Sequence, residues 1–409
     1  MTLSRRSFIA ASATAVAARR ALAAEPPPGT SAPARSPGAF DPWLEIDAPA
    51  IAHNVNTLSR LVGGRPIYAV AKNNAYGCGI ATIGPLLDRL SAIAGIAVVR
   101  GEEALALREA GVRRPVLLMG PASDEEALAL ARLNVRLAPY AEADRDRIIR
   151  LARRLGRTVQ VHIYVDTGMH RMGMPYDQVL TWLDNPSLRR AMVVDGMFTE
   201  LTEDQEFDRQ QVLRLLSIND AARAMGYALG RLHAASSDAI ARPTPETFLD
   251  SVRPGLTVYG GYPTPEMRAR GELRPVYRLK ARVLRVDTLE PGEGVSYHRR
   301  YTATETTRVA TLGLGHVDGY PTGAVKGCAV LLGGRLRPVV GTVSASHTVV
   351  ALGNDESVRP GDEAIAVGPD DPAIHPNEVA KRSDWSEYNM FMHLNPSLPR
   401  IVRGDLGAS

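Results

Sequence analysis

A lysine stands where an apolar segment ends and a turn begins. Residues 66–71, Pro-Ile-Tyr-Ala-Val-Ala, favour a buried β-strand, and residues 73–79, Asn-Asn-Ala-Tyr-Gly-Cys-Gly, favour a turn. In an α/β barrel, side chains at the carboxyl end of a strand line the active site. An amine half-buried there loses affinity for its proton and becomes a nucleophile towards an aldehyde. Lys72 is therefore a candidate for holding an aldehyde cofactor, naturally pyridoxal phosphate, although a surface lysine after an ordinary strand is the alternative.

Three further segments combine glycine turns with polar side chains. Residues 165–173, Val-Asp-Thr-Gly-Met-His-Arg-Met-Gly, follow an apolar strand and can place Arg171 over a pocket, where a guanidinium suits a carboxylate or phenolate oxygen. Residues 233–237 and 252–256 supply hydroxyls and backbone N–H groups that can bind a phosphate. Residues 292–303 contain Tyr297, which by itself could equally be a core or hairpin aromatic residue.

These segments resemble motifs of the alanine racemase family. Residues 69–79 are similar to the family's cofactor-lysine segment, AV-V/I-KANAYGHG, and residues 165–173 to DTGMxRLG. Residues 292–303 match GxxVSYxxxYTA at every specified position. The resemblance extends from about residue 42 to residue 403. It implies a pyridoxal-phosphate enzyme with a barrel domain followed by a β-domain.

The resemblance also implies a role for each matched residue. Lys72 holds the cofactor covalently, and Arg171 binds its phenolic oxygen and the substrate carboxylate. The cofactor's phosphate is bound by Tyr76, Ser237, Gly255 and Leu256. Arg253 faces the pyridine nitrogen, which then stays unprotonated, so that the carbanion is short-lived and side reactions are suppressed. From the residues alone, Arg253 could instead form an ion pair at the barrel rim.

Inversion at Cα needs two groups on opposite faces of a planar intermediate. Lys72 can serve one face, and the resemblance places Tyr297 of a second chain on the other. A tyrosine has an ordinary pKa of about 10, so nearby cations must help it to deprotonate. The resemblance thus implies an amino-acid racemase, acting on alanine by default, that forms a head-to-tail homodimer.

Several positions depart from the family pattern. Glu200 replaces a histidine, and we expect its carboxylate to pair with Arg253 and to disfavour a tyrosinate. Ala345, within Ser344-Ala345-Ser346, replaces a methionine at the substrate wall and should admit larger side chains. Tyr164 replaces a lysine that is often carbamylated, and Pro396 replaces a phosphate-binding tyrosine. A diverged relative with other chemistry, or a cofactor-binding protein without racemase activity, therefore remains an alternative.

The elements that must position these residues follow a regular order. From about residue 41 to 272, short apolar strands alternate with amphipathic helices; strands are expected at 93–99, 115–119, 135–139, 159–165, 192–198 and 229–234, and helices at 101–110, 125–133, 145–155 and 209–225. This order predicts a (β/α)8 TIM-type barrel, with an open doubly wound sheet as the alternative. Residues 273–409 are β-rich, with strands expected at 276–286, 307–314, 329–336, 338–343 and 363–367, and predict a mostly antiparallel β-domain.

The first 23 residues predict a targeting segment. Ser4-Arg5-Arg6 begins a twin-arginine pattern, the apolar run 8–18 is too short to span a bilayer, and Ala21-Leu22-Ala23 offers a cleavage site. We predict twin-arginine export to the periplasm or the medium without stable membrane anchoring; a disordered arm on a cytosolic enzyme is the alternative. Residues 24–40, rich in Pro, Ala, Ser and Gly, predict a flexible linker.

Charge and cysteine content limit the classes of partner. The chain has 48 basic and 44 acidic residues, and residues 1–23 carry four arginines and no acid, so the remainder is formally neutral. No basic stripe favours nucleic acid. Cys78 and Cys328 belong to no CxxC or Cys/His cluster, so no metal site is expected, and two buried free thiols are favoured over a disulfide.

Overall fold

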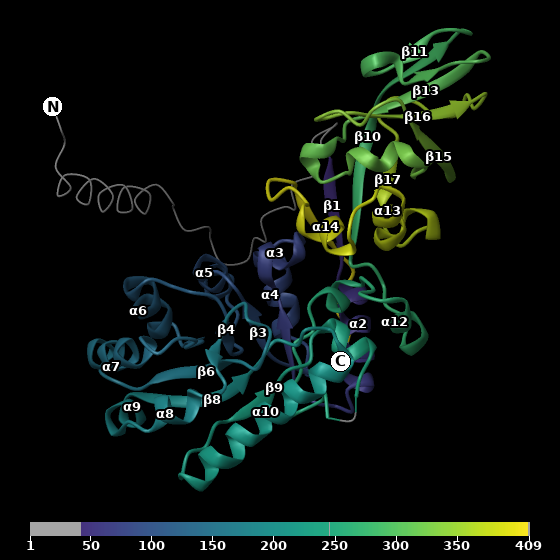
Figure 1. The fold of residues 1–409 in the computed structure, drawn as a ribbon. Helices are drawn as coiled ribbons and strands as arrows, with labels where there is room; N and C mark the ends of the chain where they lie inside the picture. The colour runs from purple at the N-terminus through teal and green to yellow at the C-terminus, as the bar shows by residue number, and fades with distance from the viewer. Residues whose placement is uncertain (1–41, 245, 408–409) are drawn as a thin grey trace, which may run out of the picture. The chain divides into compact units, whose positions relative to one another are not determined.

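The computed structural model describes residues 42–244 and 246–407, and the predicted signal segment and linker lie outside these ranges. The first part of the described chain is a parallel sheet with helices following its strands (Figure 1). Its strands run in the order β2 (Ile67–Val70), β3 (Ile93–Val98), β4 (Val116–Leu118), β5 (Val135–Leu137), β6 (Val159–Asp166), β8 (Met192–Phe198) and β9 (Arg231–His233). The short β7 (Met174–Pro175) pairs with the end of β6.

Residues 251–254 close this sheet into a barrel. On one side, Tyr68 N donates to Val252 O at 2.8 Å; on the other, Arg253 N donates to Ala235 O at 2.8 Å. Parallel bridges join Val252 to Ile67 and Ser251 to His233. This segment therefore takes the place of an eighth strand, and the predicted barrel is confirmed over the open-sheet alternative.

The barrel helices bury apolar residues against the sheet, and several of them begin at a side-chain N-terminal cap. They are α2 (Ala48–Leu61), α4 (Ile80–Asp88), α5 (Gly101–Glu109), α6 (Asp124–Arg132), α7 (Asp144–Leu155), α8 (Val179–Leu183), α9 (Pro186–Ala191), α10 (Gln205–Ala224) and α11 (Ser237–Ala241). At the start of α6, Ser123 Oγ accepts from Glu126 N at 3.2 Å, and Glu126 Oε2 accepts from Ser123 N at 3.3 Å. Such reciprocal bonds satisfy amides that would otherwise lack acceptors.

The second part is an antiparallel barrel. Its strands are β10 (Tyr277–Leu289), β13 (Thr307–Leu312), β14 (Ala329–Leu332), β15 (Arg335–Val340), β16 (Thr348–Gly353) and β17 (Glu363–Val367), in the order β13-β16-β15-β14-β17-β10, and pairing of β10 with β13 closes the ring. The segment 329–336, predicted as one strand, is instead a hairpin: Gly333 and Gly334 adopt positive φ values of 61° and 71°, which glycine allows at no steric cost. Sequence analysis did not predict β16.

The N-terminal strand β1 (Trp43–Asp47) belongs to the second sheet. It pairs antiparallel with β10, Leu44 opposite Leu279, and parallel with β18 (Arg400–Arg403). Figure 1 shows the purple β1 beside the green β10. The expected range 41–272 had placed these residues in the barrel, because an apolar strand before a capped helix has the pattern of a first βα unit.

Two C-terminal helices, α13 (Pro376–Arg382) and α14 (Glu387–Met392), accompany this sheet, and α14 contacts the barrel rim. A Cβ atom on Gly77 would lie 2.2 Å from Phe391 O, so only glycine fits at this contact. Arg400 Nη2 donates to Gly77 O at 2.7 Å. The segment after Lys72 is thereby held by residues more than 300 positions later.

Both cysteines are buried and unpaired, as sequence analysis favoured. Burial raises the pKa of the Cys78 thiol to about 12 and that of Cys328 to about 11. Both groups are therefore unreactive thiols at neutral pH. Among the described residues, the search for a helix with the length and hydropathy of a membrane span found none.

Candidate active site

The turn after Lys72 is a left-handed helix. Lys72 follows β2, and α3 (Lys72–Tyr76) has φ values of 53°, 57° and 55° at Asn73, Asn74 and Ala75. Left-handed helical backbone costs roughly 1–2 kcal/mol per L-residue, and asparagine tolerates it better than most. The turn is held by backbone bonds from Ala75 N to Ala71 O and from Gly77 N to Asn73 O, both 3.0 Å.

Glu103 connects this turn to the segment that follows β3. Its Oε1 accepts from Asn74 N at 3.1 Å, and its Oε2 accepts from Val99 N at 3.2 Å and Arg100 N at 3.1 Å. One buried carboxylate thus satisfies the start of α5 and the strained turn together. Sequence analysis missed Glu103, although a glutamate at the third position of a helix is a recognisable capping signal.

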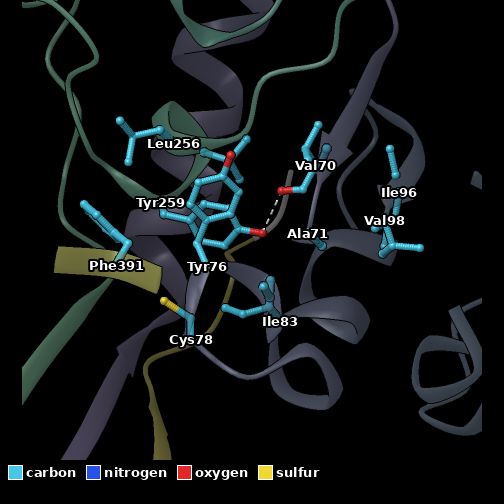
Figure 2. Packing of buried hydrophobic residues seen from close by; sticks show 14 of the residues in the cluster. Val70, Ala71, Tyr76, Cys78, Ile83, Ile96, Val98, Leu256, Tyr259 and Phe391 are labelled. Carbon is cyan, nitrogen blue, oxygen red and sulfur yellow. Dashed lines mark hydrogen bonds between the residues drawn. The ribbon is translucent and has the colours of Figure 1, made fainter. Parts of the chain in front are cut away.

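Tyr76 lies in the apolar wall behind the turn. Its ring stacks on Tyr259, with centroids 4.7 Å apart and planes at 24°. Figure 2 shows the two rings side by side, with Tyr259 Oη donating to Val70 O at 3.1 Å. Burial raises the pKa of Tyr76, so the phenol stays protonated and can donate a hydrogen bond.

Tyr76 approaches a glycine turn that can bind a phosphate. A Cβ atom on Gly255 would lie 2.2 Å from Tyr76 Oη, so a larger residue would fill this space. Ser237 Oγ, from the start of α11, accepts from Gly255 N at 2.9 Å and Thr257 N at 3.3 Å. Leu256 between them is fully buried. A phenol, a hydroxyl and backbone amides converge here. The two amides donate to Ser237 Oγ in this structure, and a phosphate oxygen is an acceptor that could replace the hydroxyl.

Arg253 is buried with nearly all its donors occupied. Only 2% of its side chain is exposed. Nη1 donates to His233 O at 2.8 Å and lies 2.7 Å from His233 Nδ1. Nη2 donates to Thr199 O at 2.7 Å and Glu200 Oε1 at 2.8 Å. With a longer contact of 3.4 Å from Nη2 to Ala234 O, the two Nη groups have five acceptors for their four hydrogens, and the described contacts give the Nε–H none.

Two neutral histidines extend inward from Arg253. Because a guanidinium can only donate, His233 Nδ1 must be the acceptor, so His233 Nε2 carries the proton and donates to His162 Nδ1, 2.8 Å away. Burial and the charge of Arg253 lower the pKa of His233 well below its usual range; burial, Arg136 and Arg253 lower that of His162 to about 3. Within the described residues, His162 Nε2 has no hydrogen-bond partner.

Glu200 lies between two arginines. Its Oε1 forms the predicted pair with Arg253, and its Oε2 lies 4.0 Å from Arg171 Nη2. Tyr164 lies beneath this group, stacked on Phe198 with centroids 4.4 Å apart. Burial and the Glu200 carboxylate raise the pKa of Tyr164, while the charges of Arg171 and Arg253 oppose that rise. Glu200 is therefore the anion shared by the two guanidinium groups.

Glu200, Arg171 and Arg253 line one cavity of about 290 Å³ at the carboxyl end of the parallel strands. Of the predicted site residues, it brings together Lys72, Tyr76, Arg171, Ser237, Arg253 and Gly255. Burial lowers the pKa of Lys72; Glu200 opposes that shift and Arg171 adds to it. Sequence analysis did not identify Met119, Met169, Glu203, Ser236 and Tyr388, which also line the cavity. Tyr388 comes from α14, which no local pattern connects with the barrel.

Three predicted residues do not line this cavity: Leu256 is buried next to Gly255, and Tyr297 and Ala345 lie elsewhere in the chain. Tyr297 is 69% exposed on the turn η2 (Tyr297–Arg299), between β11 (Gly294–Val295) and β12 (Tyr301–Thr302). Ala345 is exposed on the loop before β16. Thr342 Oγ1 contacts Tyr297 O at 3.5 Å, so the two loops adjoin. Neither residue lines the Lys72 cavity of its own chain.

A larger cavity, about 680 Å³, does not coincide with the predicted chemistry. It is lined by residues that include Asn73, Asn74, Arg100, Asn389 and His393 but none of the predicted site residues. We identify the smaller cavity as the candidate site, because the amine and the phosphate-binding donors converge there.

An amine of lowered pKa that shares a cavity at a barrel mouth with a glycine turn and a buried arginine is the arrangement expected of a barrel enzyme that uses an aldehyde cofactor. Comparison with known proteins refines this class. Residues 46–263 match the family domain described as "Alanine racemase, N-terminal domain", and residues 276–402 match "Alanine racemase, C-terminal domain". The chain belongs to the alanine racemase family of pyridoxal-phosphate-dependent isomerases.

Individual alanine racemases are similar to this chain over nearly their whole length. The alanine racemase of Desulforamulus reducens is 32% identical over 369 residues, which cover 88% of this chain and 99% of the relative. The structure of the Clostridium difficile 630 alanine racemase matches with a TM-score of 0.81 at 26% identity, covering 90% of this chain and 96% of that one. The Bacillus anthracis enzyme with bound L-Ala-P matches with a TM-score of 0.80 at 27% identity, covering 91% and 97%.

The buried histidines generate a prediction about acid stability. Their pKa values are lower in the folded chain than the unfolded value of about 6.5, so below that pH the unfolded state binds more protons and the folded state loses stability. In His162→Gln, the unfolded state has one histidine fewer to protonate, so this loss of stability is smaller. Relative to wild type, its free energy of unfolding should rise by about 1.4 kcal/mol for each pH unit lowered between pH 6 and 4. Urea unfolding of both proteins at several pH values measures this difference. Plots of unfolding free energy against pH that run parallel for the two proteins would contradict the prediction.

Proposed function

We propose that the chain interconverts the L- and D-enantiomers of an amino acid, with pyridoxal phosphate on Lys72 and alanine as the default substrate. The observation that carries the proposal is the convergence of Lys72, Arg253 and the Tyr76–Gly255–Ser237 donors on one cavity. The family relationship supports it, and so does the bound L-Ala-P of the Bacillus anthracis enzyme.

The chain's own residues bind and orient the reactants. When bound, the cofactor supplies an aldehyde for the amine and a conjugated ring that takes up the electron pair released at Cα. Ser237, Tyr76 and the turn amides hold its phosphate, and Arg171 holds the substrate carboxylate. Lys72, whose pKa burial lowers, moves the proton on one face of Cα.

Arg253 controls the ring nitrogen. Its Nη groups are fixed by His233, Thr199 and Glu200, and Arg253 lines the cavity, so we assign the Nε–H as the donor to the ring nitrogen. A guanidinium donates a hydrogen bond without surrendering its proton at neutral pH. Arg253 would thereby keep the ring nitrogen of a bound cofactor unprotonated, which would limit how far charge spreads into the ring and favour rapid return of the proton to Cα.

Tyr297 of a second chain supplies the base on the opposite face. Its exposure, and its absence from the cavity of its own chain, support this assignment. The flanking Ser296, His298 and Arg299 have φ values of 63°, 61° and 46°, and backbone strain of this kind clusters at functional sites. In the proposed head-to-tail homodimer, the Tyr297 and Ala345 loops of each chain complete the partner's cavity, and Ala345 leaves room for side chains larger than a methyl group.

Loss of the lysine amine should abolish the reaction. Wild-type protein incubated with pyridoxal phosphate and L-alanine in deuterated water should incorporate deuterium at Cα and form D-alanine. Lys72→Ala should lose the visible absorption of bound cofactor and reduce exchange by at least about 100-fold, because the base and the covalent attachment are removed together. Wild-type protein that binds the cofactor but exchanges no Cα hydrogen with any L-amino acid would refute the proposal.

Mixing two inactive variants tests the shared site. A hybrid of a Lys72→Ala chain and a Tyr297→Phe chain contains one site with both Lys72 and Tyr297 intact. Equal amounts, mixed under conditions that exchange subunits, should recover about a quarter of wild-type activity, because half the dimers are hybrids with one intact site each. Each variant treated alone is the control. No recovery, with subunit exchange verified by a size tag, would contradict a site shared between chains.

We also propose twin-arginine export to the periplasm or the medium, which the sequence of residues 1–23 supports. Residues 1–35 fused to a reporter should direct its export, and replacing both Arg5 and Arg6 with lysine should abolish it. Fractionation of cells followed by reporter assay measures this outcome. Export that is unaffected by the paired substitution would exclude the twin-arginine route.

A further inference from the structure

The two oxygens of Glu200 have unequal surroundings. Oε1 lies 2.8 Å from Nη2 of Arg253, whose side chain is 2% exposed. The other acceptors of Arg253 are backbone carbonyls and the neutral His233. A buried guanidinium without a counter-charge is costly, so the Oε1 contact is a strong, charge-assisted bond. Glu200 itself is held in place, since Gln211 Nε2 donates to its backbone O at 3.0 Å.

The second oxygen makes a loose contact. Oε2 lies 4.0 Å from Arg171 Nη2, beyond hydrogen-bond distance, and the Arg171 side chain is 61% exposed. Exposed ion pairs of this kind contribute little and exchange readily. The Glu200 side chain is 24% exposed and lines the same cavity as Arg171 and Lys72, so it borders the space that the substrate would enter.

We propose that Glu200 is a positioning residue that acts as a built-in competitor: one oxygen holds Arg253, and the other occupies Arg171 until the substrate carboxylate displaces it. The inference rests on the proposed function, because it takes Arg171 as the ligand of the substrate carboxylate. Two carboxylates then share one guanidinium fork, which can bind both oxygens of only one of them at a time. Glu200 thereby weakens the binding of simple monocarboxylates. An amino acid is affected less, because its amine also binds through the cofactor.

Binding of propionate, a carboxylate without an amine, separates this role from turnover. In Glu200→Gln the amide oxygen still accepts from Arg253, but the charge facing Arg171 is gone. Calorimetry on the cofactor-loaded protein should show propionate binding about two- to fivefold tighter than to wild type. Retention of the cofactor's absorption and of a single cooperative thermal transition, at a midpoint lowered by the lost counter-charge of Arg253, verifies that the variant is folded.

A neighbouring carboxylate provides the matched control. Glu203 lines the same cavity, and removing its charge changes the site by the same amount. It forms no ion pair with Arg171 or Arg253 among the described contacts. Glu203→Gln should therefore tighten propionate binding by less than Glu200→Gln does.

A double-mutant cycle distinguishes competition for Arg171 from a structural effect. In an Arg171→Gln background, Glu200→Gln should leave the weaker propionate affinity unchanged, because the contested group is absent. The inference would be overturned if Glu200→Gln tightened propionate binding equally in the wild-type and Arg171→Gln backgrounds, or if the single Glu200→Gln variant bound propionate no more tightly than wild type. Failure of Cα exchange in wild type would refute the proposed function while leaving this comparison measurable, because propionate does not react.

Discussion

The site depends on the left-handed turn that follows Lys72. Successive residues with positive φ store several kcal/mol of backbone strain, by the cost of roughly 1–2 kcal/mol per residue. The turn persists because Glu103 binds its amide, Gly77 allows the backbone of Phe391 to approach, and Tyr76 is locked against Tyr259. Because of this turn, Lys72 and Tyr76, only four residues apart, both line the same cavity.

The electrostatics of the cavity follow from burying one guanidinium. Arg253 donates outward to Glu200 and inward to His233, and that second bond fixes the proton positions on both histidines. Glu200 meets the need for a counter-charge that a neutral histidine at this position would leave unmet. The departure from the family pattern is thus compatible with an Arg253 side chain that is held in place by an ion pair.

Much of this arrangement was predictable from local sequence. Alternating strands and helices predicted the barrel, because apolar periodicity reports burial directly, and the segments around Lys72, Arg171 and Arg253 were recognisable as motifs. The pairing of Glu200 with Arg253 followed from the resemblance. By contrast, Tyr388 and Glu103 reach the site through tertiary packing, and the membership of β1 in the second sheet depends on partners at 277–280 and 400–403. Pairing at such separation leaves no trace in a short sequence window.

The placement of β1 bears on how a growing polypeptide acquires its structure. Leu44 and Ile46 leave the ribosome early, yet the strand against which they pair begins at Tyr277. At about 5–20 residues per second, they wait roughly ten seconds to a minute for β10, and longer for β18. During synthesis the parallel barrel can assemble while this apolar ribbon is uncovered, a period in which a chaperone or premature collapse competes for it. Only a nearly complete chain can therefore pair β1 with both of its partner strands, β10 and β18.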